Sequence, residues 1–238
     1  GTILRGADLT GANLAGIDLS GMDLSGTILR GVDLTNNDLT GSILRGVNLT
    51  GANLAGMDLT GMDLTGTILR GTDLSNSILT GVDLSGKDLT RTKLVGVDLS
   101  DHDLTETILK GVDLTGATLP SGYLSGNDFK GTIGHMTIFD EVDLSGKDLS
   151  KSNFESASFK NTNLKNANLS GAKFLEVNLT NIKNKSLAGA NLFNTAIPYS
   201  NLSGVNLDGA FLGSNNFQYT NLSGLDFTVI SEKSMNGS

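Results

Sequence analysis

The sequence contains no cysteine and no tryptophan, only two prolines, and 5% aromatic residues among its 238 positions. The absence of cysteine excludes disulfides and thiolate metal sites. A core without tryptophan and with few other aromatic side chains must be built from smaller and more uniform residues. There is also no run of 18 apolar residues, which excludes a membrane-spanning helix.

Positive charge is scarce as well, with 17 basic against 25 acidic residues and a net charge of -8. The imbalance lies in the first half: residues 1–120 hold 15 acidic and 8 basic groups, and residues 121–238 hold 10 and 9. A nucleic-acid-binding surface would be basic, so we expect no direct nucleic-acid binding. No charged and then apolar leader opens the chain, which favours a cytoplasmic location or delivery into a host cell.

The sequence is instead rich in a repeat of five residues. A leucine or phenylalanine stands at nearly every fifth position from Leu4 to Leu179, and Gly134 interrupts the series without shifting it. Three extra residues then precede Leu187, after which the same spacing runs to Phe227. Around each central residue the unit reads small residue, Asp or Asn, Leu, Ser or Thr, Gly. Neither an α-helix nor a flat strand has this period.

Elementary geometry converts the unit into a coil. Side chains two apart in an extended segment share a side, so the small residue and the leucine can point inward and Asp or Asn outward. Ser or Thr and Gly then form a corner, because tight corners often need a positive φ. Four such sides close a square coil of twenty residues, and stacked coils pair as parallel strands roughly 4.8 Å apart. Residues 1–40 and 41–80 match at 30 of 40 positions by direct count, as two coils of twenty would.

The sequence therefore predicts an all-β solenoid, a quadrilateral parallel β-helix of about 11 coils over residues 1–230. Residues 120–140 form an irregular stretch, a three-residue insertion lies near 181–186, and residues 231–238 form a short polar tail. The predicted structural core includes Leu4, Leu24, Leu44, Leu64, Leu84, Leu104, Leu144, Phe139 and Phe159. On this inward–outward frame, Asp63→Ala is expected to be nearly neutral.

The stretch "ADLTGANLAG" at residues 7–16 resembles the consensus of the pentapeptide repeat family, and the likeness extends to about residue 230. The resemblance implies a right-handed quadrilateral β-helix and no catalytic residues to transfer. A minority of that family resembles B-DNA in shape and charge and inhibits or protects DNA gyrase. Other members are segments of bacterial effectors, or cyanobacterial and plant proteins.

Two surfaces are candidate sites. The first is an apolar and basic stripe that recurs every forty residues, in which each Ile precedes a cation by two positions. Duplication of a forty-residue ancestor, with Arg stems lying over Ile, is the better explanation of this stripe. Its members are Ile28, Arg30, Ile68, Arg70, Ile108 and Lys110. The second is an acidic face formed by Asp63, Asp83 and Asp103, which are twenty apart and could approach a Ca²⁺ ion. A solvated flat face without a bound ion is the better interpretation, so no metal or cofactor is predicted.

The histidines His102 and His135 do not define a catalytic site, because the surrounding Ser and Asp belong to the repeat itself. The sequence favours a non-enzymatic rigid scaffold or protein-interaction module, one segment of a larger bacterial effector-like protein, with an unknown protein partner. The alternative is a DNA mimic that inhibits or protects DNA gyrase or topoisomerase. Because the first residue falls inside a unit, bare strand edges favour either a monomer or an end-to-end dimer.

Overall fold

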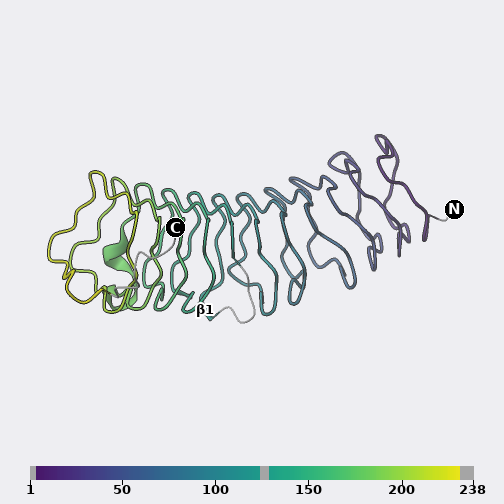
Figure 1. Ribbon diagram of the computed structural model, residues 1–238. Helices are drawn as coiled ribbons and strands as arrows, with labels where there is room; N and C mark the ends of the chain where they lie inside the picture. Colours follow the sequence, from purple (N-terminus) through teal and green to yellow (C-terminus); the bar gives the residue numbers. More distant parts are fainter. Residues whose placement is uncertain (1–3, 124–128, 231–238) are drawn as a thin grey trace.

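The computed structural model describes residues 4–123 and 129–230 and has the form of a rod of stacked coils (Figure 1). The chain advances along the rod from the purple N-terminal coils to the yellow C-terminal ones. Regular elements are few: strands β1 (Gly122–Tyr123) and β2 (Val142–Asp143), which pair in parallel, and 3₁₀ helices η1 (Leu179–Asn181) and η2 (Lys183–Lys185). Each side of a coil is too short to form a longer strand.

Parallel pairs between residues twenty apart hold the coils together. On one face Asp8 pairs with Ile28 and Ile28 with Asn48, and the same interval recurs on the other three faces. Each residue therefore lies directly over the residue twenty positions later in the chain. This is the quadrilateral parallel β-helix that the five-residue spacing predicts.

Each corner is a turn closed by the central leucine. The Ala7 amide donates to the Leu4 carbonyl at 2.9 Å, and Gly6 between them has φ 69°. A positive φ at the third residue of the turn, with a hydrogen bond from the fourth residue to the first, is typical of a type II turn. The repeat therefore favours glycine at this position, although other residues such as Asn76 and Glu106 adopt the same positive φ at their corners.

The central residues form one continuous core along the rod. Leu24, Leu84 and Phe139 are at most 1% exposed. The other predicted core residues that are buried are Leu44, Leu64, Leu104, Leu144 and Phe159. Leu4 differs and is only partly buried, because among the described residues a coil covers it on one side only.

The inward position two before each leucine carries a second, polar set of contacts. The buried Thr72 hydroxyl donates to the Leu49 carbonyl of the previous coil at 2.8 Å, and that carbonyl also accepts from the Ala52 amide at 2.9 Å. The same bond, from a residue to the carbonyl 23 positions earlier, is made by Thr27, Asn37, Thr67, Thr92, Thr107, Thr132, Thr137, Ser152 and Thr162. These bonds explain why Thr is accepted inside the coil, where a buried hydroxyl needs a partner.

Gly134 occupies a central position that elsewhere holds leucine, and phenylalanine rings fill the space it leaves. A Cβ added there would lie 2.7 Å from Cδ1 of Phe154 and 3.2 Å from Cε2 of Phe139. The Phe139 and Phe159 rings stack at 5.1 Å, and the Phe154 ring meets Phe139 edge-on at 5.4 Å. The apparent break in the repeat is therefore a packing substitution in an unbroken core.

The three extra residues before Leu187 form η2. Paired residues are twenty apart as far as the pair of Asn153 with Lys173. Pairs that span the extra residues, such as Asn168 with Asn191, are 23 apart, and the interval returns to twenty at Ser186 with Asn206. Ile182 keeps the inward position and is buried, so the extra turn points outward without disturbing the core.

Gly134→Leu restores the repeat consensus but should destabilise the protein by about 1–3 kcal/mol, because the new side chain overpacks the phenylalanine cluster. Thermal unfolding followed by circular dichroism measures the change. The double variant Gly134→Leu/Phe154→Leu should recover most of the loss. If Gly134→Leu alone were stabilising, the packing explanation would be wrong.

Candidate functional site: an open acidic corner and a cationic edge

The outward Asp or Asn of each unit caps its own corner. Oδ1 of Asp8 accepts hydrogen bonds from the Thr10 amide at 3.0 Å and the Thr10 hydroxyl at 2.6 Å. This Asx turn satisfies an amide that lies outside the ladder between coils. Oδ1 of Asp63 likewise accepts from the Thr65 amide at 2.8 Å. Asp63→Ala would remove this hydrogen bond, so we expect the substitution to destabilise the protein, whereas the outward position alone predicts a nearly neutral effect.

The candidate acidic face lies where outward carboxylates stack on one another. Asp63, Asp83 and Asp103 are all exposed and occupy equivalent positions in three successive coils. Hydrogen bonds from the Ser85 hydroxyl and amide lower the pKa of Asp83 below 3.8. The hydroxyl and amide of Thr105 likewise lower the pKa of Asp103, although the charge of Asp83 opposes the shift. These carboxylates are therefore ionised at neutral pH.

The ladder between coils is open wherever Asp stacks on Asp. Among the described residues, no pairing joins Asp63 to Asp83 or Asp83 to Asp103. The neighbouring face behaves in the same way at two further acid–acid contacts, Asp18 with Asp38 and Asp38 with Asp58. Like charges directly opposite one another on neighbouring strands are destabilising, which is one cause of missing pairs.

The backbone ladder between coils does form where residues of opposite charge stack on one another. Asp73 pairs with Lys93, whose Nζ lies 2.9 Å from Oδ2 of Asp73, and Lys93 pairs in turn with Asp113. Acid–acid stacking is not the only setting in which the ladder is open. In the described part of the chain, other stacked positions are also not paired with each other, among them Asn13 with Asp33, Ile43 with Asp63, Ile68 with Asp88, and Ile78 with Asp98. Most of the open places lie around one corner of the rod, and Asn13 with Asp33 and Ile68 with Asp88 lie elsewhere. We call this the acidic corner and define it as Asp38, Asp58, Asp63, Asp83, Asp98, Asp101 and Asp103.

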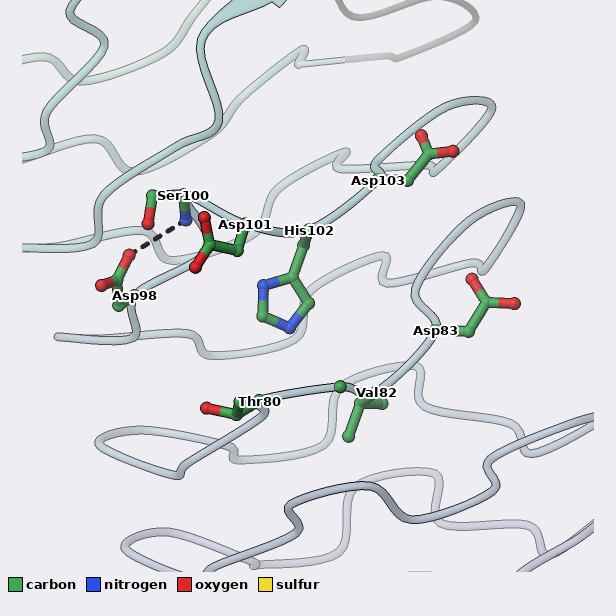
Figure 2. A pocket seen from close by; sticks show the side chains of 9 residues that line it. Thr80, Val82, Asp83, Asp98, Ser100, Asp101, His102 and Asp103 are labelled. Atoms are coloured by element: carbon green, nitrogen blue, oxygen red, sulfur yellow. Dashed lines mark hydrogen bonds between the residues drawn. The ribbon is translucent and has the colours of Figure 1, made fainter.

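A cleft of about 290 Å³ lies in the acidic corner between the coils of residues 80–83 and 98–103. Figure 2 shows the His102 ring in the middle, Asp98 and Asp101 on one side, and Asp83 and Asp103 one above the other on the far side. Nε2 of His102 lies 2.9 Å from the Leu79 carbonyl oxygen, as the inward Thr hydroxyls do elsewhere. Nδ1 of His102 is buried and has no hydrogen-bond partner.

The acidic corner does not form a metal centre in the described part of the chain, where no group of three or more His, Cys, Asp or Glu residues could hold an ion. The Asp98 carboxylate accepts from the Ser100 amide at 2.9 Å and so belongs to a corner turn. His102 is likewise used as an inward structural residue. What the acidic corner offers chemically is an exposed negative surface along neighbouring coils.

The stripe predicted from the sequence lies on a different side of the rod. Ile28, Ile68 and Ile108 occupy one face, with Arg30, Arg70 and Lys110 at the corner that follows it. Ile68 is 44% and Ile108 38% exposed, whereas Ile28 is only half-buried between Asp8 and Asn48 and contributes less to the apolar surface. The structure thus brings these six residues to one side of the rod.

This corner carries more cations than the forty-residue interval indicates. Five successive coils each place one basic residue there, and we call this set the cationic edge: Arg70, Arg91, Lys110, Lys130 and Lys151. A shallow groove of about 450 Å³ is lined by four of these residues together with Asp88, Thr90 and Gly111. The sequence spacing missed Arg91 and Lys151 because they replace the corner glycine and so stand one position later than the others. Counted in steps of twenty, the cationic edge lies diagonally opposite the acidic corner.

The family model for pentapeptide repeats matches in eight copies, which span residues 2–183 and 199–228. The chain belongs to the pentapeptide repeat family. Its coil is accordingly the right-handed quadrilateral β-helix of that family.

Solved structures with similarity include HetL, a pentapeptide repeat protein involved in heterocyst differentiation regulation from the cyanobacterium Nostoc. HetL is 30% identical, with 87% of this chain and 89% of that one covered and a TM-score of 0.44. QnrB1, a plasmid-mediated fluoroquinolone resistance protein, is 14% identical, with coverages of 86% and 87% and a TM-score of 0.48. Rfr23 from the cyanobacterium Cyanothece is 24% identical, with coverages of 80% and 90% and a TM-score of 0.24. No curated protein matches the chain. In the residues that the structure describes, no helix has the length and apolar character to cross a membrane.

Asp83→Asn should stabilise this pentapeptide repeat protein at neutral pH and low salt. Asn keeps the acceptor for the Ser85 amide, as Asn13 does for Ala15, while both acid–acid contacts of Asp83 disappear. We expect a gain of up to about 1 kcal/mol at low salt and less in 1 M NaCl, where the Debye length is about 3 Å. Asp113→Asn is the control, because Asp113 has the same cap but Lys93 and Ile133 as its stacked neighbours. Equal melting shifts for the two variants would contradict the charge explanation.

The capping hydrogen bonds also predict the pH dependence of stability. Hydrogen bonds from the hydroxyls and amides of Thr10 and Thr60 lower the pKa of Asp8 and Asp58 below 3.8. A pKa lower in the folded than in the unfolded state contributes stability above the unfolded value, and this stability is lost as pH falls through the folded value. The melting temperature should therefore be nearly constant above pH 5 and fall progressively below pH 3.8. A melting temperature that rises on acidification would show that acid–acid repulsion outweighs the caps.

Proposed function

We propose that this protein is a non-enzymatic rigid rod that acts as a scaffold or protein-interaction module. The observation that carries this proposal is the cationic edge, where five successive coils present one exposed cation each on a hydrogen-bonded backbone. At this corner the Gly71 amide donates to Thr90, Arg91 to Lys110, and Gly111 to Lys130, at 2.9–3.1 Å. A ladder of this kind holds surface charges at a fixed interval, which suits recognition of an extended partner.

The remaining chemistry supports an interaction role over catalysis. Function must be argued from a site, and a fold alone does not carry one. Most of the described outward Asp side chains cap corners, and the inward Thr side chains discussed above are buried donors. The two large clefts discussed above are shallow surface features between coils. Membership of a bacterial effector-like protein and delivery into a host cell remain predictions.

DNA mimicry is the weaker alternative. A rod about 50 Å long would need roughly 30 negative charges to match B-DNA, which has about one per 1.7 Å, whereas this chain has a net charge of -8. Duplex DNA is also negative on every side, whereas this rod has a cationic edge diagonally opposite its acidic corner. A partner that recognises DNA would therefore meet repulsion along one edge.

A supercoiling assay with purified DNA gyrase separates the two functions. The scaffold proposal expects no inhibition of supercoiling and no protection from a quinolone when the protein is in molar excess over gyrase. The variant Asp63→Asn/Asp83→Asn/Asp103→Asn serves as the matched control, since it keeps the caps and removes the acidic column. Submicromolar inhibition by the native protein that this variant lacks would establish mimicry and overturn the scaffold proposal.

A further inference from the structure

The cationic edge is only partly neutralised within the molecule. Arg70 lies 3.4 Å from Asp88 and Lys130 lies 3.9 Å from Asp148, and both cationic side chains are about half exposed. Among the described residues, no acid lies within ion-pair distance of Arg91, Lys110 or Lys151. Exposed ion pairs of this kind contribute little to stability. The edge is therefore available to an external anionic surface.

Two of the cations stand where the fold prefers glycine. Arg91 has φ 61° and Lys151 has φ 62°, while Gly71, Gly111 and Gly131 hold the same corner position in the intervening coils. In both of the coils concerned, Thr90 and Ser150 occupy the position that carries the cation elsewhere. A positive φ is unfavourable for a residue with a Cβ, and other corners such as those of Asn76, Glu106 and Met136 carry it as well, so it is not peculiar to the cationic edge.

The spacing of the cations selects the partner. They follow the interval between coils, roughly 4.8 Å. An extended peptide presents same-side residues about 6.6 Å apart, and each strand of duplex DNA places phosphates about 3.4 Å apart along its axis. Neither interval stays in step with the cationic edge over five coils. A second solenoid of the same kind has the matching interval by construction.

The acidic corner of this same chain has both the required charge and the required spacing. Its carboxylates begin at Asp38 and continue to Asp103, with at least one on every coil. The missing ladder bonds at this corner leave backbone amides such as that of Gly81 without a partner in the described structure. Asp63 lies 3.4 Å from Arg45 and is partly neutralised, whereas in the described part of the chain no cation lies within ion-pair distance of the other carboxylates of the acidic corner.

We propose that two copies of this protein associate side by side, with the cationic edge of one against the acidic corner of the other. This inference rests on the proposed role as an interaction module and names its partner as a second copy of the chain. Because the two surfaces lie diagonally opposite on each rod, the contact is heterologous and can propagate into a lateral array. The association is salt-sensitive and concentration-dependent, because exposed charge pairs carry it.

Aromatic stacking platforms, which single-stranded nucleic acid requires, are not provided by the residues of the cationic edge. The net charge of -8 opposes approach of any long polyanion as well. A second copy of the chain is also negatively charged and is repelled at long range. Salt at about 0.1 M screens this repulsion beyond roughly 10 Å, while ion pairs in direct contact persist.

Sedimentation velocity over a hundredfold concentration range tests the proposal. The native protein should show a rising weight-average sedimentation coefficient in about 50 mM NaCl and a constant, monomeric one in about 500 mM NaCl. Arg70→Glu/Arg91→Glu/Lys110→Glu should remain monomeric in both. Lys160→Glu/Lys165→Glu/Lys185→Glu makes the same change in net charge away from the cationic edge and should still associate.

A charge-exchange mixture identifies the two surfaces. Asp83→Lys/Asp101→Lys/Asp103→Lys should be monomeric alone, and Lys is tolerated at the outward position because Lys93 and Lys173 occupy it. Mixing this variant with Arg70→Glu/Arg91→Glu/Lys110→Glu should restore association, whereas each alone should not associate. Circular dichroism melts establish that both variants are folded.

Three results would overturn the lateral contact: a native protein that is monomeric at every concentration, association that survives both sets of substitutions, as end-to-end contacts would, or no recovery in the mixture of folded variants. Each of them leaves the scaffold proposal standing, since a foreign partner could still bind. Gyrase inhibition, in contrast, would overturn the scaffold proposal and leave the sedimentation result unaffected.

Discussion

The stacking of each residue on the residue twenty positions later is the constraint on which the rest of the structure depends. Apart from its corner turns and Asx caps, the backbone of a coil finds its hydrogen-bond partners in the coils on either side. The side chains stacked at each position therefore influence whether the ladder forms there. Asp73 over Lys93 keeps the ladder, and Asp63 over Asp83 does not. In a solenoid such local differences stay local, because each coil touches only its neighbours.

The fold is predictable from sequence because the same five-residue rule is repeated dozens of times. The leucine interval fixes the inward side, and the glycine interval fixes the corners, as the positive φ of Gly6 and its equivalents shows. The partner stripe could be predicted in part for the same reason, since Arg70 and Lys110 keep their repeat position. Arg91 was not predicted, because it stands at the glycine position, one residue later than the repeat position of Arg70 and Lys110.

Other features depend on contacts between coils that no single unit encodes. The Thr72 hydroxyl reaches a carbonyl 23 residues earlier, and Phe154 fills the space of Gly134, twenty residues before it. Nζ of Lys87 donates to the Leu64 carbonyl at 2.8 Å and so takes the place of a Thr hydroxyl. The open acidic corner likewise requires comparing residues twenty apart, whereas each unit taken alone fits the consensus.

Amide hydrogen exchange measured residue by residue tests most directly whether stacked charges control the ladder. The account predicts fast exchange for the amides of Gly81, Asp83 and Asp103, and slow exchange for those of Lys93, Asp113 and Ile133, which donate to the preceding coil at 2.9–3.0 Å. In Asp83→Asn, exchange of the Asp103 amide should slow. Equal protection of the two sets of amides, or an unchanged exchange rate of the Asp103 amide in Asp83→Asn, would contradict this account.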